Sequence, residues 1–286
     1  MQTLSVAEFS LRLAVGLGCG ALIGLERQWR ARMAGLRTNA LVAAGAGMLA
    51  EATRTDVIAN NLANAGTAAY KKDLAVAKDF HSLLIQRIND GPNRPTIGSL
   101  GVGAMIDEVA TIHAAGGLKP TGNPLDLAIE GRGFFAVETP DGIRYTRNGS
   151  FTRNSQGELV TLDGYRVLGQ GGAIQLGDVR SRINIGEDGR VMVDDAEADT
   201  LRIVGFADER RLVKEGASLF AAGPGLQEEA ATGSVVREGY LENSNVNVVA
   251  ELVTLISGLR AYEVNGKAVQ AHDQLLDKAV NEVGRV

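Results

Sequence analysis

The last 40 residues carry apolar side chains at alternating spacings of three and four, the repeat of a helix that packs along another helix. Asn245 or Asn247 can cap the start of this helix, and Glu251 lies in its first turn, where an acidic side chain is favourable. Eight of the ten positions in the repeat are apolar, so we expect a coiled-coil helix over 244–286 that needs a partner. The ten positions are Leu252, Leu255, Leu259, Tyr262, Gly266, Val269, Asp273, Leu276, Val280 and Val283.

A second helix is predicted towards the other end of the chain. Apolar residues at positions 48, 49, 52, 58, 59 and 62 have helical spacing. Asparagines then accumulate before Gly66, which favours a helix end near residue 63. We expect this helix, over 47–63, to be the partner of the C-terminal helix. An extended segment to Tyr70 and a further helical stretch over 74–88 should follow it.

Between the predicted helices, short β-rich runs alternate with turn signals. The runs cover 134–137, 145–151, 158–161, 183–185, 190–193 and 201–206. The turn dipeptides supply the positive φ angles that tight hairpins need. They are Asp141-Gly142, Asn148-Gly149, Gln156-Gly157, Asp163-Gly164 and Asp188-Gly189. We therefore expect a mainly β, antiparallel central domain over 98–243, preceded over 48–97 by the N-terminal helix and its extended segment.

The first 47 residues have a different character. Residues 6–25 form an apolar run near the ~20 residues that cross a bilayer, although Glu8 and Arg12 lie within it. Arginines at 27, 30, 32 and 37 follow, as in a cytoplasmic loop beside a membrane helix. Glycines at 16, 18 and 20 lack the flanking strand and acid of a dinucleotide site, so small-residue packing explains them better. We expect a membrane-type helix and a basic loop over 1–47, with inner-membrane contact through 6–25.

Composition argues against several classes of function. The net charge is −5, and outside the first 47 residues no basic stripe is present that could follow a nucleic-acid backbone. Cys19 is the one cysteine, so no intrachain disulfide can form, and it has no general base on its own segment. Histidines at 81, 113 and 272 stand too far apart to suggest a metal pair. We expect no enzymatic activity, no cofactor, no metal and no nucleic-acid partner.

Three separated stretches resemble the flagellar basal-body rod and hook family, of the FlgF/FlgG rod type and closest to the Gram-positive rod proteins FlhO and FlhP. The first is TRTDVIANNLANAGTAAYKK at 53–72. The second is TGNPLDLAIEGRGFFAVETPDGIRYTRNGSFTRNSQGELVTLDGYRVLG at 121–169. The third is GYLENSNVNVVAELVTLISGLRAYEVNGKAVQAHDQLLDKAVNEVGRV at 239–286. The resemblance extends over 48–286.

This resemblance implies a structural subunit of the basal-body rod that assembles into a helical tube and transmits torque for motility. Its partners would be copies of itself, other rod and hook proteins, and the flagellar type III export apparatus that carries it across the membrane. The family's terminal helices would form the inner tube, with the β domain outside. The resemblance assigns helix ends and packing to Ile58, Asn60, Asn61, Leu62, Asn64, Ser244, Asn245, Asn247, Leu252, Leu255, Leu259, Tyr262, Val269 and Leu276, and places Arg132, Gly133 and Phe134 in the β-domain core and turn.

Residues 20–46, GALIGLERQWRARMAGLRTNALVAAGA, resemble the amino-terminal end of the MgtC/SapB family of inner-membrane proteins. They stand where rod proteins carry a short segment that helps export and helix packing. Two alternatives to a working rod subunit follow from this junction of sequences. The first alternative is an MgtC/SapB-like inner-membrane protein with a rod-protein passenger. The second is a non-functional fusion of two gene fragments.

Overall fold

The computed structural model describes residues 41–79, 82–86, 96–101, 103–178, 180–216 and 218–283. These residues form two compact units. Of the described residues, one unit contains those over 41–52, within Ala77–Ile106 and from Leu259 to residue 283, and the other contains those within Thr53–Val76 and Asp107–Gly258. The apolar run over 6–25 lies outside the described residues. Within them, no helix combines the length and apolar character needed to cross a membrane.

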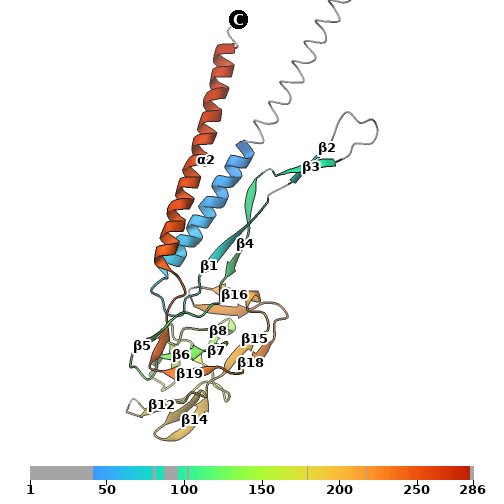
Figure 1. Ribbon diagram of the computed structural model, residues 1–286. Coiled ribbons are helices and arrows are strands. Elements are labelled where there is room, and N and C mark those ends of the chain that lie inside the picture. The colour runs from blue at the N-terminus through green and yellow to red at the C-terminus, as the bar shows by residue number, and fades with distance from the viewer. Residues whose placement is uncertain are drawn as a thin grey trace, which may run out of the picture. The chain divides into compact units, whose positions relative to one another are not determined.

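The second unit is built around an antiparallel nine-stranded sheet (Figure 1). Its strands are β7 (Phe134–Thr139), β8 (Gly142–Thr146), β9 (Phe151–Arg153), β10 (Leu159–Thr161), β11 (Arg166–Val167), β15 (Ile203–Phe206), β16 (Leu212–Glu215), β17 (Leu219–Ala222) and β18 (Glu228–Ala230). The order is β16-β17-β8-β7-β11-β10-β9, and β15 pairs with both β7 and β18. A short 3₁₀ helix, η1 (Glu209–Arg211), comes directly before the edge strand β16.

Smaller antiparallel sheets complete this unit. Their strands are β5 (Leu118–Pro120) with β20 (Tyr240–Glu242), β6 (Leu127–Glu130) with β19 (Val235–Glu238), and β12 (Ile183–Ile185), β13 (Arg190–Val193) and β14 (Ala196–Thr200). The turn between β13 and β14 is unusual, because Asp194 and Asp195 have left-handed φ angles of 50° and 67°. The expected antiparallel β domain is therefore confirmed, with several predicted turn glycines at positive φ, Gly142 and Gly189 among them.

Two hydrophobic clusters hold the β strands together. The larger joins aliphatic residues and Phe135 and Phe151, whose ring centroids lie 5.1 Å apart at nearly a right angle. The smaller is mostly aromatic and contains Phe134, Tyr145, Val204, Phe206, Leu212 and Phe220. Since the two faces of β7 alternate, Phe134 and Phe135 point into different clusters. This strand therefore lies between the two cores.

One predicted strand divides in two. The run over 145–151 becomes β8 and β9, separated by a turn through Gly149. A Cβ at Gly149 would lie 1.7 Å from the carbonyl oxygen of Leu127, so only glycine allows this approach. The amide of Leu127 donates to the Gly149 carbonyl at 3.0 Å, which ties the turn to β6.

Two helices flank the β segments in sequence: one described over 41–63, and α2 (Val248–Val283), which is red in Figure 1. In the first unit they contact each other through small residues. A Cβ at Gly47 would lie 2.9 Å from Asn265 Nδ2, and a Cβ at Gly266 would lie 3.9 Å from Met48 Cε. The described part of the chain is thus a mainly β domain with two long helices, and the first helix ends at residue 63 as expected.

The prediction of a helix over 74–88 is wrong. The structure has β1 (Asp73–Asp79), which pairs with β4 (Ala104–Thr111), and β2 (Ser82–Gln86), which pairs with β3 (Thr96–Gly101). Leu74 and Val76 stand two residues apart, which is the spacing of one strand face. The apolar spacing over 74–88 fits either a helix or a strand, and hydrogen bonds to a partner strand distant in sequence decide for the strand. The β region therefore starts at Asp73, well before the expected residue 98.

Candidate functional site

Three segments that are distant in sequence meet within the second unit. We refer to residues 60–73, 111–117 and 242–247 together as the junction. Backbone hydrogen bonds join them in pairs: Ala69 N to Glu242 O at 2.7 Å, Asn245 N to Tyr70 O at 3.2 Å, Ile112 N to Lys72 O at 2.9 Å, and Asn243 N to Gly117 O at 2.8 Å. The end of the first helix, the start of α2 and the chain leaving β4 are therefore fastened to one another.

A buried ion pair lies at the centre of the junction. Lys71 Nζ is 2.6 Å from Glu242 Oε1, and the two side chains are 0% and 1% exposed. Lys71 also donates to the Ala114 carbonyl at 2.9 Å, and the same Glu242 oxygen accepts from Gly116 N at 2.7 Å. Burial lowers the pKa of Lys71, and the Glu242 carboxylate opposes that shift. These hydrogen bonds supply partners that a charge needs when it leaves water.

We refer to the nine-stranded sheet and the smaller sheets of the second unit as the β body. A second cation approaches the same carboxylate from this β body. Arg147 Nη1 lies 3.7 Å from Glu242 Oε2 and donates to the Ile129 carbonyl at 2.9 Å. Its guanidinium carbon lies 5.6 Å from the ring centroid of Phe134. Burial lowers the pKa of Arg147, an effect that Glu242 opposes. Arg147 thus links the junction to the aromatic core through the ring face of Phe134.

Two asparagine side chains act in the junction as substitutes for backbone. Asn61 is 1% exposed and exchanges two hydrogen bonds with Asp73: its amide donates to Asp73 O at 2.8 Å, and its oxygen accepts from Asp73 N at 2.9 Å. Asn245 accepts from Lys72 N at 2.8 Å and donates to the carbonyls of Ile112 at 2.7 Å and Ala114 at 3.1 Å. Each asparagine satisfies main-chain groups at or beside the ends of β1 and β4.

The remaining asparagines close the helix ends. Asn247 caps α2, because its side-chain oxygen accepts from Ala250 N at 3.1 Å. The predicted alternative, Asn245, has the different role given above. Asn60 accepts hydrogen bonds from Tyr70 OH at 3.0 Å and from the Asn64 side chain at 2.9 Å. Ser244 accepts from Val246 N at 3.2 Å. The polar residues expected at the helix ends therefore each form hydrogen bonds at or near their own helix end.

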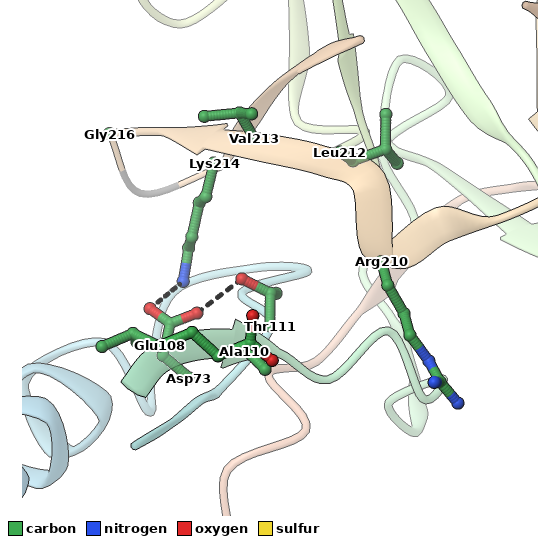
Figure 2. A pocket seen from close by; sticks show the side chains of 10 residues that line it. Asp73, Glu108, Ala110, Thr111, Arg210, Leu212, Val213, Lys214 and Gly216 are labelled. Atoms are coloured by element: carbon green, nitrogen blue, oxygen red, sulfur yellow. Dashed lines mark hydrogen bonds and ion pairs between the residues drawn. The ribbon is translucent and has the colours of Figure 1, made fainter. Parts of the chain in front are cut away.

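A cavity of about 520 Å³ opens beside the junction, between the edge strand β16 and the end of β4 (Figure 2). Lys214 reaches from β16 to Asp73, with Nζ 2.9 Å from Asp73 Oδ2, and Thr111 donates to the other oxygen at 2.7 Å. Lys214 also donates to Lys71 O at 2.7 Å and lies 3.8 Å from the ring centroid of Tyr70. The β body is thus attached directly to the segment that follows the first helix.

The helix stripe predicted to pack within the chain is only partly covered. Ile58 is buried, and Leu62, Leu255 and Val269 are half-buried. Leu252, Leu259 and Tyr262 are 44%, 47% and 40% exposed. The packing of this stripe against the first helix of the same chain therefore stays a prediction. The side of α2 that is covered instead contains Glu251 and Gly258, with Ala261 and Asn265 half-buried. Small residues let two helix backbones approach closely, which turns the larger side chains outward.

Sequence patterns did not single out four junction residues, Tyr70, Lys71, Asp73 and Glu242, or the two side chains that reach the junction from outside, Arg147 and Lys214. Lys71 and Glu242 stand directly beside the asparagine-rich helix ends, and that proximity was the one available signal. Their pairing is a long-range contact that no local pattern encodes. Among the described residues, no group of three or more His, Cys, Asp or Glu side chains is placed to hold a metal ion.

Comparison with protein families matches three parts of the chain. The flagellar hook protein FlgE/F/G D1 domain matches residues 128–193, and the flagellar basal body rod FlgEFG protein C-terminal domain matches 237–282. The MgtC family matches residues 13–114, which begins within the first 47 residues and extends beyond the boundary expected there. The two rod matches include much of the β body and the whole 242–247 part of the junction.

Full-length relatives agree with the two rod matches. The flagellar basal-body rod protein FlgG of Agrobacterium fabrum is 37% identical over 83% of this chain and 96% of its own length. FlgG of Bacillus subtilis is 36% identical over 80% of this chain and 93% of its own length. The flagellar hook-basal body complex protein FlhO of Bacillus subtilis is 30% identical over 86% of this chain and 98% of its own length. This chain belongs to the flagellar basal-body rod protein family.

Proposed function

We propose that the chain is a structural subunit of the flagellar basal-body rod, which assembles with copies of itself into a helical tube that transmits torque. The carrying observation is the outward face of α2. Val249, Leu252, Val253, Ile256 and Leu259, here named the outer stripe, are 72%, 44%, 60%, 51% and 47% exposed. A contiguous apolar face of this kind marks an interaction surface.

The spacing of the outer stripe fits a helix-to-helix contact. Its first four members stand at positions i, i+3, i+4 and i+7, which share one side of an α-helix. The covered line through Glu251 and Gly258 lies on a different side. Among the described residues, α2 therefore has one side engaged within the chain and one apolar side left uncovered, which suits a helix of a neighbouring copy.

The paired helices would continue as a coiled coil that lines the tube, with the β body outside. The close approaches of Gly47 to Asn265 and of Gly266 to Met48 support this pairing. The junction gives the tube a mechanical connection to the β body, because it fastens both helices to the β strands through buried ionic and hydrogen bonds. Torque applied to the helices would then be carried by the β body as well.

This function requires no catalytic step, and it places the chain in the basal body with other rod and hook proteins as partners. Delivery would proceed through the flagellar export apparatus. The relatives named as rod proteins support this assignment.

The outer stripe can be tested by one substitution with a matched control. Ile256→Glu adds a charge to the stripe, whereas Gln270→Glu adds the same charge at an exposed polar position of α2. Sedimentation and electron microscopy of the full chain over a range of concentrations should show assembly for the parent and for Gln270→Glu but monomers for Ile256→Glu. Motility of a strain lacking its rod protein should follow the same order. A parent that stays monomeric at every concentration and fails to restore motility would overturn the proposal.

A second candidate is an MgtC/SapB-like inner-membrane protein that carries the rod region as a passenger. The MgtC match over 13–114 and the sequence of residues 20–46 favour it. If this candidate is right, the full-length chain should stay with the membrane fraction through carbonate extraction. Recovery in the soluble or secreted fraction excludes this candidate and leaves the rod function in place.

A further inference from the structure

The segment over 111–117, here named the strap, binds both the segment that follows the first helix and the segment that precedes α2. The carbonyl of Ile112 accepts from Asn245, and the carbonyl of Ala114 accepts from both Asn245 and Lys71, at 2.7, 3.1 and 2.9 Å. The Ile112 amide donates to Lys72 O at 2.9 Å. These four bonds lie on the residues directly before and after His113. The position of His113 therefore controls the connection of both helices to the β body.

The His113 side chain seats the strap in the aromatic core. Its ring centroid lies 5.8 Å from that of Phe134 and 5.1 Å from that of Phe220, and both phenylalanines are 1% exposed. Both ring nitrogens are buried and have no hydrogen-bond partner among the described residues. An imidazole in this place contributes as an apolar ring, and its polar atoms gain nothing from the contact.

The charges around His113 come from four different elements. Lys71 of the junction, Arg147 after β8 and Lys214 of β16 disfavour a positive ring, and Glu209 of η1 favours one. A cavity of about 350 Å³ adjoins the ring and gives it a path outward. The other charged residues lining that cavity are Arg132, Asp208 and Arg210. Arg132 already engages Glu209 at 3.0 Å, which weakens the one attraction available to a protonated ring.

We propose that His113 is a pH-sensitive latch: the neutral ring keeps the strap seated, and protonation withdraws the ring and loosens both helix bases together. A charged ring cannot keep two unpartnered nitrogens between phenylalanines, whereas outside the core both N–H groups reach water. The carbonyls of the strap accept hydrogen bonds from Lys71 and Asn245. When the His113 ring leaves the core, the strap therefore releases the bases of both helices in one step.

The direction of the pH effect follows from the folded-state pKa. Burial is the main cause that lowers the pKa of His113 below its ordinary value of 6.5, and Glu209 opposes this in part. The folded state then takes up its proton at lower pH than the unfolded state. The contribution of His113 to stability is complete above pH 6.5 and is lost as the pH falls below it, by at most tenfold in the equilibrium constant per pH unit.

Hydrogen exchange of the full chain, at concentrations where it is monomeric, tests the latch. Protection factors for residues 53–63 and 248–258 should fall together below pH 6.5, while those of β7 remain high. His113→Phe keeps a ring in the core and removes the titration, so its protection should not change over this range. His272→Phe removes a histidine of α2 outside the junction and should keep the parent profile. Equal acid-induced loss in the parent and in His113→Phe would overturn the proposal.

A measurement on the unmodified chain covers the case in which His113→Phe does not fold. The His113 ring resonances can be titrated by NMR in the native chain and compared with a short peptide spanning 110–116. Protonation at a lower pH than in the peptide, together with loss of the Phe134 and Phe220 contacts, supports the latch. Protonation at the same or a higher pH, with those contacts kept, rules it out. Both measurements use the monomer, so they are independent of rod assembly.

Discussion

The ammonium of Lys71 lies 2.6 Å from a carboxylate oxygen of Glu242, and the two residues are 171 positions apart in the chain. This contact can exist only when the segment after the first helix and the segment before α2 have both folded onto the β body. Because both side chains are buried, removing one partner leaves the other charge without compensation. The pair therefore specifies which two segments meet, whatever its net contribution to stability.

Breaking this pair from one side should be strongly destabilising. We expect Glu242→Gln or Lys71→Met to lower the free energy of unfolding by about 3–5 kcal/mol, and the double variant Lys71→Met/Glu242→Met to lose clearly less than the sum. Urea unfolding of the full chain measures this. Glu130→Gln, in the exposed pair with Arg237, is the matched control and should leave the free energy of unfolding nearly unchanged. Additive effects of the two single variants would show that Lys71 and Glu242 are not coupled.

Local features of the fold were predictable from sequence, and long-range features were not. The Asn247 cap, the helix end at residue 63 and the turn glycines at 142 and 189 each depend on a few neighbouring residues. The contact between Lys71 and Glu242 and the position of His113 in the aromatic core depend on segments that are remote in sequence. No periodicity or propensity reports such pairings, so the residues of the junction centre were missed.

The wrong prediction over 74–88 has a long-range origin. Residues 74–88 have apolar residues compatible with either a helix or strands, and the pairings of β1 with β4 and of β2 with β3 decide for strands. The packing of the heptad stripe of α2 against the first helix stays a prediction. Gly258 is buried and Ala261 is half-buried on another side of α2, whereas Leu252 and Leu259 are exposed.

The two asparagines at the start of α2 should differ sharply in their response to substitution. Asn247→Ala removes a helix cap and should cost about 1 kcal/mol, whereas Asn247→Asp should be nearly neutral. Asn245→Ala leaves Lys72 N and the Ile112 carbonyl without their partner and should cost more, about 2–4 kcal/mol. Asn245→Asp keeps only the acceptor and should not restore stability. Thermal unfolding of the four variants gives the ranking; equal losses at positions 245 and 247 would contradict it.

Adjacent glycines of the strap provide a test of the close approach between strap and helix base. A Cβ at Gly116 would lie 1.9 Å from the carbonyl oxygen of Asn243, whereas a Cβ at Gly117 would meet nothing within 4 Å. Gly116→Ala should therefore displace the strap and lower the unfolding midpoint markedly, and Gly117→Ala should leave it nearly unchanged. If both variants unfold with the parent's midpoint, the strap does not pass Asn243 as described.

The turn between β13 and β14 contains avoidable backbone strain. Asp195 has a φ of 67°, a conformation that glycine adopts without steric cost, and its side chain is exposed. Asp195→Gly should raise stability by up to about 1 kcal/mol, less the added entropy of the unfolded chain, while Asp195→Ala should lower it. Asp194 must be kept, because its carboxylate accepts from Arg182 N at 2.8 Å. A higher denaturant midpoint for Asp195→Ala than for Asp195→Gly would contradict the left-handed turn.

Tyr70 should make the junction sensitive to alkaline pH. Burial, with a smaller contribution from Asp73, raises the pKa of Tyr70 from 10.0 to about 12. Its hydroxyl donates to Asn60 at 3.0 Å and to Asn61 at 3.3 Å, bonds that a phenolate cannot make. The folded state therefore keeps its proton at a pH where the unfolded chain loses it, so the contribution of Tyr70 is complete below pH 10 and is lost between pH 10 and about 12. Tyr70→Phe should be less stable than the parent at neutral pH by about 1 kcal/mol and should lack this alkaline component. Parallel unfolding curves at rising pH measure both effects, and an identical alkaline loss in Tyr70→Phe would assign it to another group.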